Sequence, residues 1–123
     1  MKKKLSKFTG EMNYCMMRIN NIDPVYINNI DEMKTLLINV AKAMNATIVE
    51  NGILFHQFKP FGITGLIIIG ESSLELHSII EASVLQLKFS SCSKKLKVSN
   101  GVKYIVDILK LREKDFKIEE VNI

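Results

Sequence analysis

Side chains that could do chemistry gather directly after the most apolar run of the chain, ITGLIIIG at 63–70. Glu71, Ser72 and Ser73 follow this run, and His77 comes five residues after Ser72. Because Gly70 leaves the next peptide conformationally free, a serine hydroxyl in a strained turn there is placed to attack the carbonyl before it. A neutral histidine within reach of a hydroxyl or amide can act as a base near neutral pH. Without further signals, the same residues also fit a polar turn between strands.

Two more residues could take part in such chemistry. Thr64 begins the apolar run beside Gly65, whose missing side chain leaves room for a close approach, and Cys92 ends a later predicted strand. Each has a simpler interpretation, Thr64 as a β-former near a Pro60–Gly62 turn and Cys92 as a small buried apolar residue. No CxxC or Cys/His spacing indicates a metal site, and the two cysteines favour free thiols over a disulfide.

The patterning along the chain predicts the elements that must position these residues. A first strand is expected at 11–19, a turn at 20–24 and an amphipathic helix at about 29–45. Five strand signals follow, at 46–50, 52–58, 62–70, 73–80 and 83–92. In the fourth, Leu74 and Leu76 alternate with Glu75 and His77, which predicts that His77 points away from the core. A second amphipathic helix is expected at 99–113 and a last strand at 115–123.

This order, with helices flanking a block of strands, predicts an α+β fold. We expect a two-layer α/β sandwich, with a mainly antiparallel sheet and two helices on one face, in a single domain over residues 1–123.

Composition excludes several classes of protein. With 47% apolar and 24% charged residues, the 123-residue chain has an ordinary globular balance. Its net charge of +4 comes largely from short lysine runs, and no known nucleic-acid-binding motif accompanies them, so we expect no nucleic-acid partner. No apolar run is long enough for a membrane span, and MKKKLSKF lacks the apolar core of a signal peptide, which favours a cytoplasmic location.

Taken together, the spacings resemble a known family. The pattern FHQFKPFGITGLIIIGES…H…E…C, close over residues 53–92, resembles the small bacterial and archaeal class of S-adenosylmethionine decarboxylase proenzymes. The family has a hydroxyl residue eight before the serine and a phenylalanine six before that hydroxyl, and here these are Thr64 and Phe58. The family's histidine five after the serine, its glutamate four further on and its cysteine fifteen after the histidine correspond to His77, Glu81 and Cys92. The chain departs from the family pattern at Ser73, where the family has histidine, at Ile79–Ile80, in place of an aromatic residue and proline, and at Ser93–Lys94.

The resemblance implies that the chain makes its own cofactor and adds none from outside. Ser72 would attack the Glu71 carbonyl, with His77 as base and Thr64 in support, and the chain would divide into a β chain, 1–71, and an α chain, 72–123. Ser72 would become a pyruvoyl group, which forms a Schiff base with the substrate amine and accepts electrons as CO₂ leaves.

The resemblance also implies a substrate and a partner. Cys92 would reprotonate the substrate carbon, Phe58 would stack on adenine and Glu81 would bind the ribose hydroxyls of S-adenosylmethionine. The product would serve spermidine biosynthesis, and two processed protomers would form a homodimer. Two alternatives stay open: a pyruvoyl-dependent arginine or ornithine decarboxylase of the same family, and a non-catalytic paralogue that regulates an active partner.

Overall fold

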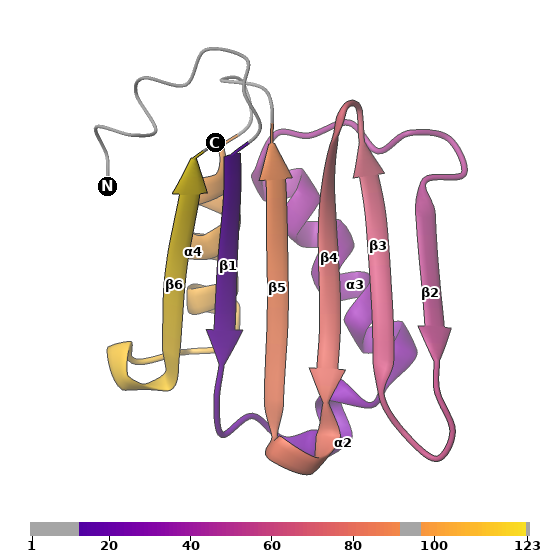
Figure 1. The fold of residues 1–123 in the computed structure, drawn as a ribbon, viewed down its shortest axis with the longest axis vertical. Coiled ribbons are helices and arrows are strands. Elements are labelled where there is room, and N and C mark those ends of the chain that lie inside the picture. The colour runs from indigo at the N-terminus through magenta and orange to yellow at the C-terminus, as the bar shows by residue number, and fades with distance from the viewer. Residues whose placement is uncertain (1–12, 92–96, 123) are drawn as a thin grey trace.

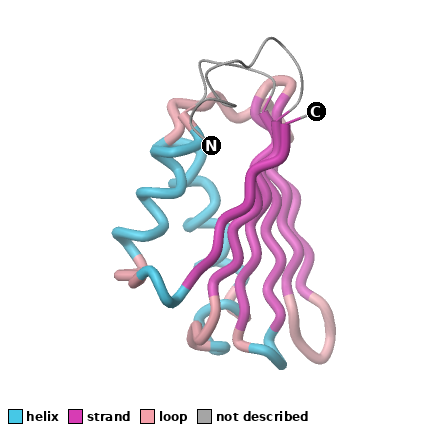
Figure 2. The backbone as a smooth tube through the Cα atoms, turned by 60° about the vertical axis from the view of Figure 1, so that its left-hand side comes forward, coloured by secondary structure: helices cyan, strands magenta, loops and turns pink. Residues whose placement is uncertain are grey.

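The chain folds into one antiparallel sheet with helices packed on one of its faces (Figures 1 and 2). The computed structural model describes residues 13–91 and 97–122. The strands run in the order β2-β3-β4-β5-β1-β6, and every neighbouring pair is antiparallel. Their bounds are Asn13–Ile19 (β1), Ile53–Gln57 (β2), Ile63–Ile69 (β3), Ser72–Ile79 (β4), Val84–Ser91 (β5) and Phe116–Asn122 (β6). The predicted α+β two-layer sandwich is confirmed.

Two long helices, α3 (Ile30–Ala43) and α4 (Val98–Ile108), cover the sheet. The α3 helix begins where the Asn29 side chain accepts a hydrogen bond from the Glu32 N–H at 3.0 Å, which caps an otherwise unpaired donor. Its apolar stripe is buried at Met33, Leu36, Leu37, Val40 and Ala41. The two helices also pack on each other, since a Cβ on Gly101 of α4 would lie 2.8 Å from the Cγ of Met44.

The strand alternation gives the sheet two different faces. On β4, Ser72, Leu74, Leu76 and Ser78 are buried, while the residues between them are only half-buried. The buried set points toward α3 and α4, and we call this side the helix face. No described helix covers the other side, which Figure 2 shows edge-on and which we call the open face. The apolar core therefore lies entirely between the helices and the helix face.

The structure corrects two predicted elements. Residues 46–50, predicted as a strand, form none, because the chain turns through the left-handed region at Asn45 and Asn51 (φ +59° at each). Only isolated bonds join this segment to β3, such as Val49 N–H to the Ile68 carbonyl at 3.0 Å. The predicted turn at 20–24 ends in a short helix, α2 (Pro24–Ile27), which Asp23 caps and a first-turn proline favours.

The second helix, predicted over 99–113, ends at Ile108, because the chain turns through the left-handed region at Lys110 (φ +53°). The remaining expectations hold with small shifts at the ends. The first strand begins at Asn13, and the two predicted residues before it lie outside the described part of the chain. Short 3₁₀ helices, η1 (Ile80–Ala82) and η2 (Glu113–Asp115), precede β5 and β6. None of the helices in residues 13–91 and 97–122 is long and apolar enough to cross a membrane.

Candidate active site

Ser72 begins β4 directly after the tight hairpin that joins it to β3. The two strands pair up to Ile69 and Ser72, so that only Gly70 and Glu71 form the loop. Gly70 has φ +67°, the left-handed region that the first residue of a type II′ hairpin loop requires. Glu71 is exposed, whereas the Ser72 residue is only 5% exposed, on the helix face. The hairpin therefore presents the Glu71–Ser72 peptide at the rim of the sheet.

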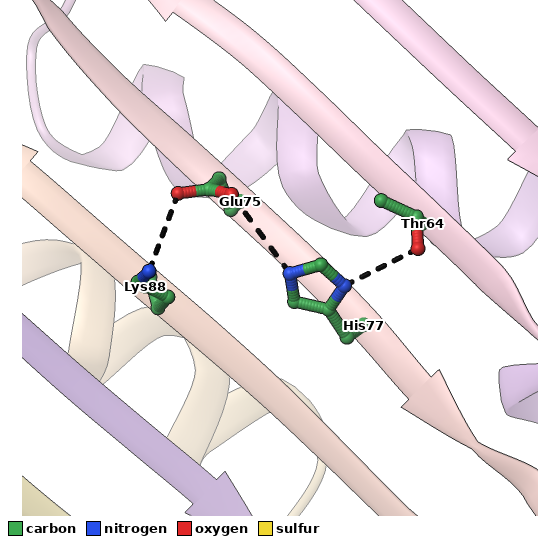
Figure 3. A network of polar contacts seen from close by, with 4 residues as sticks. All are labelled: Thr64, Glu75, His77 and Lys88. Carbon is green, nitrogen blue, oxygen red and sulfur yellow. Dashed lines mark hydrogen bonds and ion pairs between the residues drawn. The ribbon is translucent and has the colours of Figure 1, made fainter.

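Thr64 and His77 meet on the open face, at the far end of the same two strands. They are direct register partners on β3 and β4, and the Thr64 Oγ1 lies 3.2 Å from the His77 Nδ1 (Figure 3). The predicted outward direction of His77 is confirmed, since Leu76 beside it is fully buried on the helix face. A hydroxyl and an imidazole in contact form the pair that proton transfer needs.

Glu75 and Lys88 extend this contact along the open face. Glu75 Oε1 lies 3.8 Å from His77 Nε2, and its other oxygen, Oε2, lies 3.7 Å from the Lys88 Nζ (Figure 3). We call Thr64, Glu75, His77 and Lys88 the histidine cluster. The sequence alternation already put Glu75 on the His77 face, but its pairing with Lys88 depends on the register between β4 and β5, which no local signal fixes.

The two predicted substrate residues lie at the His77 end of the sheet. Phe58 follows β2 and is 48% exposed, and its N–H donates to the Gly62 carbonyl at 2.8 Å across the turn that leads into β3. Its ring meets the His56 ring edge-on, with centroids 4.6 Å apart. Glu81 is exposed in η1, directly after β4. Because β2 ends where β3 begins and β4 ends, Phe58, His77 and Glu81 share one edge of the molecule.

Cys92 lies outside the described residues. The strand before it, β5, ends on the Ser72 side of the sheet, where Ser73 and Ser90 are register partners. The other cysteine, Cys15, is buried on the helix face. Burial, with a smaller contribution from the Glu120 charge, raises the pKa of the Cys15 thiol to about 11. This thiol stays protonated at neutral pH and is a poor nucleophile.

Within one chain, the site residues fall into two separate groups. Ser72 and His77 stand five residues apart on β4, which is about 16 Å along an extended strand. Their side chains also point to opposite faces. The structure thus brings Thr64 and His77 together and keeps both away from Ser72 of the same chain.

A metal centre finds no support in the described part of the chain. Residues 13–91 and 97–122 contain no group of three or more His, Cys, Asp or Glu side chains that could hold an ion.

Comparison with known proteins identifies the family. Residues 13–122 match the family model described as S-adenosylmethionine decarboxylase. The chain belongs to the S-adenosylmethionine decarboxylase family.

Curated relatives carry the name S-adenosylmethionine decarboxylase proenzyme. The one from Thermodesulfovibrio yellowstonii is 30% identical over 76% of this chain and 68% of its own length. The relative from Oceanobacillus iheyensis is 35% identical over 68% of this chain and 64% of its own length. The relative from Sulfurihydrogenibium is 31% identical over 83% of this chain and 75% of its own length. The crystal structure of the adenosylmethionine decarboxylase from Aquifex aeolicus superposes with a TM-score of 0.75 over 90% of this chain and 88% of that one; at 18% identity it supports the fold alone.

Proposed function

We propose that this protein is a self-cleaving proenzyme of a pyruvoyl-dependent decarboxylase that acts on S-adenosylmethionine and supplies spermidine biosynthesis. The observation that carries the proposal is the contact between Thr64 and His77, at the two positions where the family pattern requires a hydroxyl and a base. Ser72 at the rim hairpin supports it, because a peptide held by a tight loop is presented in one orientation.

In this proposal, Ser72 is consumed during cleavage. Its Oγ attacks the Glu71 carbonyl carbon, and the amide bond is exchanged for an ester. Transfer of the Ser72 Cα proton to a base then breaks the Cβ–Oγ bond and expels Glu71 as a carboxylate. Water hydrolyses the remaining enamine and releases ammonia, which leaves a pyruvoyl group at the start of an α chain of residues 72–123. That group supplies an electron sink when a substrate loses CO₂.

The base has to come from a second copy of the chain. His77 cannot approach Ser72 of its own chain without the loss of the β3–β4 ladder, because about 16 Å of strand separates them. In a two-fold dimer, each protomer contacts its partner through the same residues, so two equivalent sites form together. We therefore propose a homodimer in which the Ser72 end of one protomer meets the His77 end of the other.

The open face is a suitable dimer surface. Apolar side chains that are more than a third exposed lie on it in four strands: Tyr14, Met16, Leu54, Ile68 and Val121. Apolar area of this kind is stabilised when a partner removes it from water. A second open face, which carries the same side chains, offers a matching surface of the same composition.

Phe58 and Glu81 support the nucleoside substrate over arginine or ornithine. Phe58 offers an exposed aromatic ring on which adenine can stack, and Glu81 offers a carboxylate that can accept hydrogen bonds from ribose hydroxyls. Neither feature is needed for a small amino acid. The named relatives favour the same substrate. Cys92 is proposed as the proton donor to the substrate carbon.

Co-expression of two inactive variants tests the two-copy site. A His77→Asn chain and a Ser72→Ala chain with a tag of different mass should each stay uncut when expressed alone. In a mixed dimer, Ser72 of the first chain meets His77 of the second, so intact mass spectrometry should find only the His77→Asn chain cleaved. At equal expression about half of it should be cut, because random pairing puts about half of the chains in mixed dimers.

Two results would contradict the proposal at different levels. An uncut His77→Asn chain in the mixture, with normal cleavage of the wild type, would disprove the shared site alone. A wild-type chain that stays intact would disprove self-cleavage and favour the regulatory paralogue. Release of labelled CO₂ from carboxyl-labelled S-adenosylmethionine, compared with arginine and ornithine, decides the substrate.

A further inference from the structure

Glu75 is the one carboxylate in contact with the proposed base among the described residues. It lies two residues before His77 on the open face of β4, and it contacts the ring nitrogen opposite the one that faces Thr64. We propose that Glu75 is a positioning residue for self-cleavage: its carboxylate keeps the His77 proton on Nε2, so that Nδ1 beside Thr64 is the proton acceptor. This inference rests on the proposed function.

The geometry of the ring supports this assignment. A neutral imidazole carries one proton, and the hydrogen bond at one nitrogen decides which nitrogen bears it. The Glu75 Oε1 lies 3.8 Å from Nε2, beyond hydrogen-bond distance, but its negative charge is nearest to this nitrogen and favours a proton there over a bare lone pair. The Nδ1 lone pair then faces the Thr64 hydroxyl, which donates to it across 3.2 Å. After Nδ1 takes up a proton, the new positive charge lies beside the Glu75 carboxylate, which stabilises it.

Glu75 also contacts Lys88, whose positive charge offsets the effect of the Glu75 charge on His77. The Lys88 ammonium lies 3.7 Å from Glu75 Oε2 and holds that carboxylate against β5. The other groups that face His77 are neutral Thr64 on β3 and Gln86 on β5. Beyond them lie His56 on β2 and Arg18 on β1. Glu75 is therefore the nearest anion to His77 in this arrangement, and Lys88 is the cation paired with it.

The proposed dimer strengthens these contacts. The side chains of His77, Glu75 and Lys88 are 35%, 32% and 37% exposed in the single chain. At such exposure, water screens charge–charge contacts strongly. A second open face laid over them removes that water, and a buried charge pair interacts more strongly than an exposed one.

Nitrogen-15 nuclear magnetic resonance of the neutral His77 ring tests the tautomer, because protonated and unprotonated ring nitrogens have well separated chemical shifts. In the wild type, Nε2 should carry the proton. Glu75→Gln should raise the population of the form with the proton on Nδ1, and Lys88→Met should not. His56, the only other histidine in the chain, is the internal reference and should keep its tautomer in every variant.

The rate of self-cleavage tests the positioning role. Glu75→Gln should slow cleavage at least about tenfold, because the neutral amide no longer favours a proton on Nε2 and the ring can adopt the wrong tautomer. The matched control is Asp107→Asn in α4, which makes the same chemical change in an exposed pair 2.8 Å from Lys103. That variant should cleave at the wild-type rate.

The outcomes separate this inference from the proposed function. Growth of the form with the proton on Nδ1, together with slow cleavage of Glu75→Gln, supports the positioning role. Wild-type cleavage by Glu75→Gln would overturn it, and so would an unchanged His77 tautomer in that variant. A wild-type chain that never cleaves would disprove the proposed function, and the nitrogen-15 spectra would still show whether Glu75 sets the tautomer of His77.

Discussion

The helix face and the open face of the same six strands are built for different purposes. Leu76 is fully buried against the helices, and His77, the next residue, contacts Thr64 on the other side. Gly65 and Thr64 make the same division on β3, where Gly65 lies against the Phe55 ring. Since successive strand residues point to opposite faces, one strand can hold a dry core and a polar cluster at once. Substitutions at adjacent positions should therefore have separable effects.

The largest effect is expected for a substitution on the open face, and it should change the rate of self-cleavage without changing stability. His77→Asn should slow self-cleavage by about 10²–10⁴-fold, the usual contribution of a positioned acid or base. Its free energy of unfolding should change by less than about 0.5 kcal/mol, because the side chain is about a third exposed on the open face. Time courses of intact mass and urea unfolding measure the two quantities. A loss of stability equal to that of a core variant would contradict the separation of the faces.

The adjacent core substitution should give the reverse result. Leu76→Ala should lower the free energy of unfolding by about 2–5 kcal/mol, through lost burial and the cavity left behind. Folded Leu76→Ala protein at low temperature should still cleave near the wild-type rate. Loss of cleavage in a sample that circular dichroism shows to be folded would mean that the two faces are coupled.

Gly65→Ala is expected to have a smaller effect, also on the helix face. A Cβ at this position would clash with the Phe55 Cε2, so the ring must shift and the strand must strain. Overpacking of this kind costs about 1–3 kcal/mol. Thr64→Val, one residue away on the open face, is the matched comparison and should slow cleavage with little change in thermal stability. An unchanged melting temperature for Gly65→Ala would show that the ring moves freely.

The smallest effect is expected at Cys15, and only at alkaline pH. Its pKa is raised from 9.0 to about 11, so between these values the thiol ionises in the unfolded chain before it does in the folded one. The stability from this thiol is therefore present below about pH 9 and is lost as the pH rises toward 11. Urea midpoints over this range should fall more steeply for wild type than for Cys15→Ala. Parallel slopes would place the thiol in a wetter environment.

Sequence reasoning works best where a pattern repeats along one element. The alternation Leu74–Glu75–Leu76–His77 was enough to predict which residues of β4 face the core. It fails where a few backbone angles decide the outcome. Residues 46–50 have the composition of a strand, but the left-handed turns at Asn45 and Asn51 leave too little straight chain for a ladder.

The candidate site was predictable in type but not in arrangement. Family spacing pointed to Thr64, His77 and Ser72, yet it could not show that the last of these lies far from the other two within a chain. The role proposed for Glu75 depends on which residue of β5 stands opposite. That register is a long-range property of the sheet, fixed by the joint packing of all its strands.

The order of the strands has a consequence for what a cut after Glu71 leaves behind. The fragment 1–71 carries β1, β2 and β3, and the fragment 72–123 carries β4, β5 and β6. Because the sheet runs β2-β3-β4-β5-β1-β6, β1 of the first fragment sits between β5 and β6 of the second. The two pieces are interleaved through three ladders, β3–β4, β5–β1 and β1–β6, and neither can leave without dismantling the sheet. Once unfolded, the cut protein is two chains that must meet before even a single protomer can fold, so the folding of the protomer itself becomes a bimolecular step.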